Sequence, residues 1–177
     1  VIDPVSVIVT HLSEIIKRHI HELVTRQDIN TLLQNVAKFN PAITEDVIPG
    51  IVSLSDLQNI LNNLLTEGIP IRDMESILET LGEPGVAIKD TDKLTEYVRQ
   101  RLKRTITKKY TDGSNIKVVT LDQEIENTIL NSTKKSEYGT YLAIEPQLVQ
   151  SIVEGVTEQI GKSKELVGQP VVLTSPV

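Results

Sequence analysis

The sequence predicts a mixed α and β protein, in which an all-helical subdomain precedes a small α/β subdomain with a short, incomplete sheet. Three observations support this prediction. Apolar residues recur at helical spacing through roughly the first hundred positions. Helix-capping residues stand directly before several of these apolar stripes. Beyond about residue 110, turn-forming residues alternate with short β-branched runs that are typical of strands.

The composition narrows the class of protein. The chain has 177 residues, a formal net charge of −6, no cysteine, and only 3% aromatic residues. The acidic balance argues against general binding to nucleic acid or anionic membranes. The absence of cysteine excludes disulfides, thiol catalysis and thiolate zinc sites. Few aromatic side chains are available for stacking on bases or sugars.

The first two predicted helices start at capping signals. Asp3-Pro4 places a capping carboxylate before a proline, and the stripe that follows continues to Leu23. "TRQD" at residues 25–28 is a capping box that starts the second helix. Asn40-Pro41 is expected to end that helix.

Three further helices are predicted before residue 107. "SLSD" at residues 53–56 caps one helix, and Gly68 ends it. The stretch "TEGIPIRDMESILETL" at residues 66–81 predicts the next, with Arg72 beside Asp73 in its first turn. A cation at that end of a helix is mildly unfavourable. After the break at "GEPG", apolar spacing from residue 94 to 106 predicts one further helix.

The remaining third of the chain predicts strands and helices in alternation. Strands are expected at residues 116–121, 140–144 and 170–174, after a turn at "TDGSN". Helices are expected from Asp122 to about Asn131, and from Glu145-Pro146 to about residue 160. This order predicts one small sheet with helices packed on it.

The candidate motifs for cofactor binding, metal binding and catalysis each lack residues that the motif requires. "GKS" at residues 161–163 lacks the glycine and the preceding strand of a phosphate-binding loop, and is typical of a helix C-terminus. His19 and His21 should point to different sides of a helix, so no metal site is expected. No spacing indicates a catalytic set. We therefore expect no cofactor, no metal and no enzymatic activity.

One basic cluster runs through "RQRLKR" and "KKY", at residues 99–104 and 108–110. Nucleic-acid binding would require these cations on one helix face with aromatic residues between them. Their spacing spreads them instead around the helix. A solvated face, or contact with acidic neighbours, is the better interpretation.

Several long stretches resemble the FHIPEP family of type III secretion export-gate proteins, flagellar and injectisome alike. They are "VIDPVSVIVTHLSEIIKRHIHEL", "VIPGIVSLSDLQNILNNLLTEGIPIRDMESILETL" and "LTEYVRQRL", with looser similarity in "IKVVTLD" and "PVVLT". The resemblance implies the cytoplasmic part of a bacterial inner-membrane protein. It divides the chain into residues 1–24, the terminal helix of a preceding subdomain; 25–104, a helical subdomain; and 105–177, an α/β subdomain truncated at its C-terminus.

In this family the cytoplasmic regions form a ring, usually of nine subunits, that receives chaperone–substrate complexes. The resemblance therefore implies flagellar chaperone–substrate complexes, components of the export ATPase complex and other export-gate subunits as partners. It carries a chaperone-docking threonine over to Thr10, followed by His11. A hydroxyl bonded within its own helix is the alternative for Thr10.

The family's subunit contacts also suggest a purpose for Arg72. We expect Arg72, beside Asp73, to pair with a carboxylate, either within the subdomain or across a subunit interface. The function implied is that of a ring-forming docking platform in flagellar export. The alternative is a regulatory helical domain that binds nucleic acid through the basic helix around residues 99–109.

Overall fold

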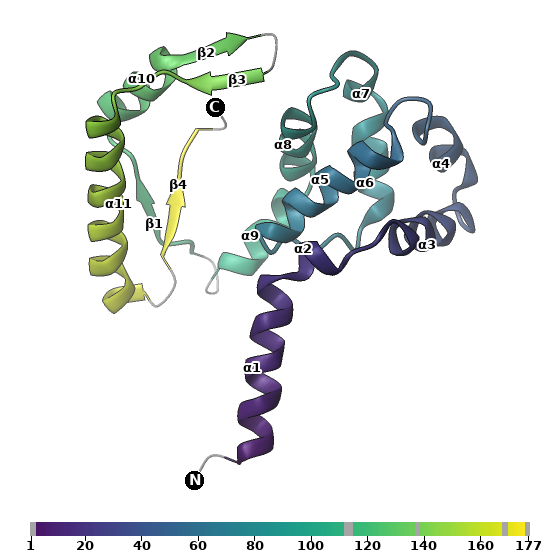
Figure 1. Ribbon diagram of the computed structural model, residues 1–177, viewed down its shortest axis with the longest axis horizontal. Coiled ribbons are helices and arrows are strands. Elements are labelled where there is room, and N and C mark those ends of the chain that lie inside the picture. The colour runs from purple at the N-terminus through teal and green to yellow at the C-terminus, as the bar shows by residue number, and fades with distance from the viewer. Residues whose placement is uncertain (1–2, 112–114, 137–138, 168–169, 176–177) are drawn as a thin grey trace. The chain divides into compact units, whose positions relative to one another are not determined.

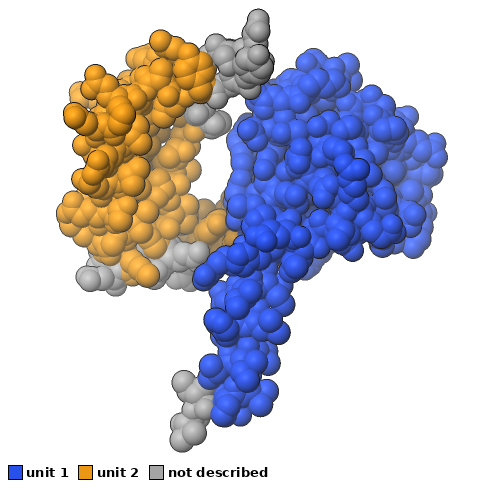
Figure 2. Space-filling model, viewed as in Figure 1, with its two compact units in different colours: residues 1–106 blue, residues 107–177 orange. Residues whose placement is uncertain are grey.

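The structure, a computed structural model, describes residues 3–111, 115–136, 139–167 and 170–175. The chain divides into two compact units, residues 1–106 and residues 107–177 (Figure 2). Helices make up the described secondary structure of the first unit, and all the described strands lie in the second (Figure 1). The predicted fold class, mixed α and β with a helical part first, is confirmed.

The first unit contains a series of mostly short helices. They are α1 (Pro4–Arg18), α2 (Ile20–Leu23), α3 (Arg26–Ala37), α4 (Pro41–Val47), α5 (Leu54–Thr66), α6 (Met74–Gly82), α7 (Pro84–Ala87) and α8 (Thr91–Arg101). The division between the units falls within α9 (Lys103–Tyr110).

The predicted helix starts are confirmed at three caps. The Asp3 carboxylate accepts a hydrogen bond from the Ser6 N–H at 3.1 Å. Thr25 and Asp28 form the complete capping box, in which each side chain bonds the other's backbone N–H. Ser53 accepts from the Asp56 N–H at 3.1 Å. Capping depends on residues three positions apart, so it can be recognised in sequence.

The helix boundaries differ from prediction at three places. The first helix breaks at His19, which separates α1 from α2. Asn40 was expected only to end α3, but it also starts α4. Its side chain accepts a hydrogen bond from the Ile43 N–H at 3.4 Å and so caps α4, and Pro41 occupies the first helical position. The helix predicted over residues 94–106 breaks at Leu102, between α8 and α9.

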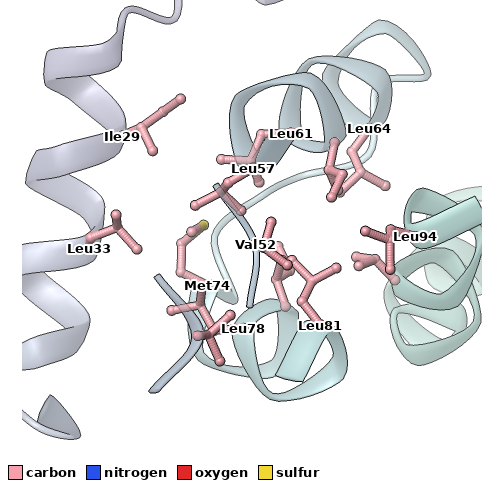
Figure 3. Close-up of a cluster of buried hydrophobic side chains, with 14 of the residues drawn as sticks. Ile29, Leu33, Val52, Leu57, Leu61, Leu64, Met74, Leu78, Leu81 and Leu94 are labelled. Atoms are coloured by element: carbon pink, nitrogen blue, oxygen red, sulfur yellow. The ribbon is translucent and has the colours of Figure 1, made fainter. Parts of the chain in front are cut away.

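The core of the first unit lies among α3, α5, α6 and α8 (Figure 3). Residues outside these helices also belong to it: Val47 of α4, Val52, Ile69 and Leu102. Its fully buried side chains include Leu57, Ile60, Leu61 and Leu64 of α5, Ile77, Leu78 and Leu81 of α6, and Val98 of α8. Each such side chain contributes roughly 1.5–3 kcal/mol by leaving water. Gly68 ends α5 at φ 67°, a conformation that glycine adopts without strain.

The second unit contains β1 (Val118–Thr120), α10 (Gln123–Ser132), β2 (Thr133–Ser136), β3 (Gly139–Leu142), α11 (Pro146–Val167) and β4 (Val171–Leu173). The three predicted strands and both predicted helices are present. The prediction of a single sheet is wrong. β1 pairs with β4 in parallel, while β2 and β3 form a separate antiparallel pair. Most of the predicted turn at "TDGSN" falls on residues 112–114, outside the described residues.

Candidate protein-interaction site

Helix α1 has no buried residue along its fifteen positions. It extends away from the helical core of its own unit (Figure 1). Its apolar side chains are 42% to 65% exposed, and most of them follow one helical stripe: Val5, Ile8, Val9, Leu12, Ile15 and Ile16. An apolar stripe of this length is normally covered by another element. Helix α1 is therefore not part of the core described here, and its apolar stripe is left uncovered within the described residues.

Thr10 lies on the opposite side of α1 from this stripe, because successive residues rotate by about 100° around a helix. It shares that side with polar positions such as Ser6 and Lys17. Thr10 is exposed. Within the described residues its hydroxyl makes no hydrogen bond, whereas the hydroxyl of Thr31 bonds the Gln27 carbonyl of its own helix at 2.9 Å. The Thr10 hydroxyl is thus available to an external donor or acceptor.

His11 is also exposed and lies at the edge between the two faces of α1. Thr10 and His11 are thus two exposed polar positions that lie away from the centre of the apolar stripe. Their role in binding stays a prediction. The residue spacing alone could have shown which face Thr10 occupies.

The structure places Arg72 and Asp73 differently from the sequence prediction. Asp73 is the N-cap of α6, since its carboxylate accepts from the Ser76 N–H at 3.3 Å, and the helix begins at Met74. Arg72 therefore precedes the helix instead of occupying its first turn. Across the part of the chain that is described, no carboxylate pairs with Arg72. Pairing across a subunit interface stays a prediction.

The basic cluster is partly neutralised within the chain. Arg99 of α8 donates from Nε to Glu67 Oε2 at 2.8 Å and from Nη2 to the other oxygen of the same carboxylate. It also donates to Glu96 at 2.7 Å. These hydrogen bonds, with Glu67 contributing most, raise the pKa of Arg99. The bidentate pair fastens α8 to the end of α5.

Arg101 pairs with Glu79 of α6 at 3.4 Å. Contact with acidic neighbours, the interpretation favoured from the sequence, thus holds for Arg99 and Arg101. Since these two cations are already paired with carboxylates, the basic cluster presents less positive charge to a nucleic acid, which weakens the alternative function.

The predicted separation of His19 and His21 is wrong, because the chain leaves helical geometry at His19. His19 Nδ1 lies 2.9 Å from Glu22 Oε1, and His21 Nε2 lies 3.7 Å from the same oxygen. The His19 hydrogen bond, followed by the His19 charge, lowers the pKa of Glu22. The described residues contain no cluster of three or more histidine and acidic side chains that could hold a metal ion.

One other sequence prediction concerns a helix C-terminus. "GKS" lies inside α11, which continues to Val167, so it is not the helix C-terminus that was predicted. Among the described residues, no helix combines the length and the apolar character needed to cross a membrane.

These features define a class: a helical scaffold with an uncovered amphipathic helix at one end and a small α/β unit after it. The chain belongs to the FHIPEP family, whose family model matches residues 1–177. It is 37% identical over 160 residues to the flagellar biosynthesis protein FlhA of Bacillus subtilis, covering 90% of this chain and 24% of that protein. The chain thus spans about a quarter of the length of such relatives.

Solved structures share the fold. The structure of the Chlamydia pneumoniae CdsV and CdsO protein complex matches 89% of this chain and 46% of the compared chain, with a TM-score of 0.81 and 34% identity. The nonameric EscV cytosolic domain from the type III secretion system matches 89% of this chain and 53% of that chain. Its TM-score is 0.69 and its identity 25%.

Proposed function

We propose that this chain is a cytoplasmic part of a type III export gate and acts as a ring-forming docking platform for chaperone–substrate complexes in flagellar assembly. The observation that carries the proposal is the family match along all 177 residues. The same fold in the nonameric EscV cytosolic domain supports ring formation. The role is one of transport and binding.

The division of the chain follows from the same proposal. Residues 1–24 form the terminal helix of a preceding subdomain, 25–104 the helical subdomain, and 105–177 the α/β subdomain. The apolar stripe of α1, uncovered here, supports this division because it gives α1 a face to pack on that preceding region. The whole protein is then anchored in the bacterial inner membrane, with this part facing the cytoplasm.

The proposed partners are flagellar chaperone–substrate complexes, export ATPase complex components and other export-gate subunits. The free hydroxyl of Thr10 supports a role in docking, since a polar group at a protein interface contributes orientation and specificity. The complex of CdsV with CdsO is consistent with this part of the family binding other secretion proteins.

The proposal is tested by titrating a fluorescently labelled flagellar chaperone–substrate complex against this chain and against a longer chain extended at both ends. We expect the longer chain to bind. Thr10→Ala in that chain should weaken binding by about two- to tenfold, the effect of one lost hydrogen bond. Binding to residues 1–177 alone would place a contact surface within this chain.

Thr31→Ala is the matched control, because Thr31 is an exposed helical threonine whose hydroxyl is satisfied within its own helix. Equal weakening by both substitutions would remove Thr10 from the docking site. Failure of both chains to bind would contradict the docking function, and a nucleic-acid titration at varied salt would then test the alternative.

A further inference from the structure

Three carboxylates of the first unit have no partner within the described residues, and they lie together. Every other aspartate and glutamate described in that unit accepts a hydrogen bond or pairs with a cation. Glu45, Asp46 and Glu83 are exposed and make neither kind of contact there. A Cβ added at Gly82, beside Glu83, would lie 3.5 Å from Val47 Cγ2 at the end of α4. We call these three carboxylates the acidic patch.

The acidic patch is unfavourable for the chain that carries it. Glu45 and Asp46 occupy the last turn of α4, where the helix carbonyls already concentrate negative charge and where the helix has no cation. The carboxylates also repel one another, because like charges at short range do. A cation from outside the chain would remove both penalties.

The helix break at Leu102 separates two pairs of cations in the basic cluster. Before the break, Arg99 and Arg101 are held by carboxylates. After it, Lys103 and Arg104 open α9, whose first turn contains no acidic residue. Both are exposed, and within the described residues neither side chain has an ion-pair or hydrogen-bond partner. A cation in the first turn of a helix is unfavourable, so these two residues, which we call the basic turn, are also placed at a cost.

The acidic patch and the basic turn are too far apart to meet within one chain. Residues 103–106 belong to the first unit, and α4 and the start of α9 lie on opposite sides of its core (Figure 1). In a second copy of the chain, however, each surface finds the opposite charge.

We propose that the basic turn of one subunit docks on the acidic patch of the next, in a head-to-tail contact between copies of this chain. A contact between two different surfaces generates a ring when its rotation closes. The role of this contact in a secretion ring rests on the proposed function.

Phe39 supplies the apolar part of this contact. It is the single phenylalanine of the chain and is 89% exposed. It lies two residues before α4, a helix about 10 Å long whose other end carries Glu45 and Asp46. Exposed ion pairs alone contribute little affinity, whereas aromatic side chains are enriched in protein interfaces. Phe39 and the acidic patch are therefore the two parts of the surface on which the neighbouring subunit docks.

The contact is tested by the self-association of the 177-residue chain, followed by sedimentation velocity at low and high salt. We expect association at low salt that weakens as salt screens the charges. Lys103→Gln with Arg104→Gln, and Glu45→Gln with Asp46→Asn, should each weaken the association by about tenfold. Phe39→Ala should weaken it by about fivefold, the effect of losing an interface anchor.

Mixing the two neutralised variants isolates a single contact. One variant keeps its acidic patch and the other keeps its basic turn, so an equal mixture should form dimers and nothing larger. A chain with exchanged charges, Lys103→Glu and Arg104→Glu together with Glu45→Lys and Asp46→Lys, keeps the net charge of −6. It should recover most of the association of the unsubstituted chain.

Glu154→Gln with Glu158→Gln is the matched control, because it neutralises two exposed carboxylates of α11 and should leave the association unchanged. Association that every variant retains in full would overturn the contact and leave ring formation to another surface. A chain that stays monomeric at low salt would overturn it as well, and poly-glutamate binding by that monomer would assign the basic turn to a different acidic partner. Docking is measured separately, by the titration of the chaperone–substrate complex, so neither result bears on it.

Discussion

The helical core and the α/β unit differ in how completely they bury apolar side chains. In the first unit, α5 and α6 together bury nine apolar residues, five on α5 and four on α6. In the second unit no described side chain is buried, and Val153 of α11 remains 58% exposed. A domain needs a buried apolar core to offset the entropy of ordering its chain. The two units should therefore differ sharply in their response to the same kind of substitution.

The largest difference is expected when an apolar side chain is shortened in each unit. Leu61→Ala should lower the free energy of unfolding by about 2–5 kcal/mol, because it leaves a cavity in a closed core. Val153→Ala should lower it by less than about 0.5 kcal/mol. Urea unfolding followed by circular dichroism measures both. Equal losses would show that α11 is buried against something else in solution.

Glycine substitutions sharpen the comparison. A Cβ added at Gly85 would lie 2.9 Å from the Cγ2 atoms of Ile51 and Val52, so Gly85→Ala should cost about 1–2 kcal/mol. At Gly155 of α11 the added Cβ would meet nothing within 4 Å beyond its chain neighbours and its own helix backbone, so Gly155→Ala should stabilise α11 by about 0.5–1 kcal/mol. Opposite shifts in the thermal midpoint are expected, and shifts of the same sign would contradict this description.

A smaller effect is expected from the ion pair between α5 and α8. Arg99→Ala should cost about 1 kcal/mol, because it removes a bidentate pair that is partly exposed to solvent. Arg101→Ala, whose pair with Glu79 is longer and more exposed, should cost less than about 0.5 kcal/mol. The urea midpoints of the two variants provide the measurement. If Arg101→Ala lowered the free energy of unfolding more than Arg99→Ala, the Arg101–Glu79 pair would be the stronger of the two, contrary to this prediction.

The smallest effect concerns the capping box of α3. Hydrogen bonds from the Thr25 side chain and backbone lower the pKa of Asp28 below its usual value of 3.8. Its stabilisation is therefore fully present above that pH and is lost as the pH falls through the lowered value. Asp28→Asn should reduce the fall in stability between about pH 5 and pH 3. If Asp28→Asn had the same pH profile of stability as the unsubstituted chain, the hydrogen bonds of the capping box would not be formed in solution.

The sequence predicted what depends on near neighbours along the chain. The caps at Asp3, Thr25 and Ser53 involve residues three apart and could be identified directly. The sequence prediction started α6 too early. The apolar spacing of α6 can be extended back through Arg72, whereas in the structure the Asp73 carboxylate caps the helix, which begins at Met74. Asn40-Pro41 carries both a stop signal and a start signal, and the start was missed.

Features that depend on distant residues could not be predicted in the same way. β2 lacks a β-branched run, and its strand forms because β3 pairs with it. The contact of His19 and His21 with one carboxylate required the helix break at His19, which no capping signal marks. For the candidate site, the exposure of Thr10 and its position opposite the apolar stripe follow from helical spacing. The free hydroxyl required the structure.

The parallel pairing of β1 with β4 also affects the order in which the protein can fold during its synthesis. Val118 pairs with Val171, so about fifty residues separate the partners along the chain. Pairing across such a separation is slow compared with local helix formation. As the polypeptide emerges from the ribosome, the helical unit is complete before β4 has been made, and domains generally fold in that order. The pairing of β1 must wait for β4, so we expect the α/β unit to stay open to proteases and chaperones for longer than the helices before it.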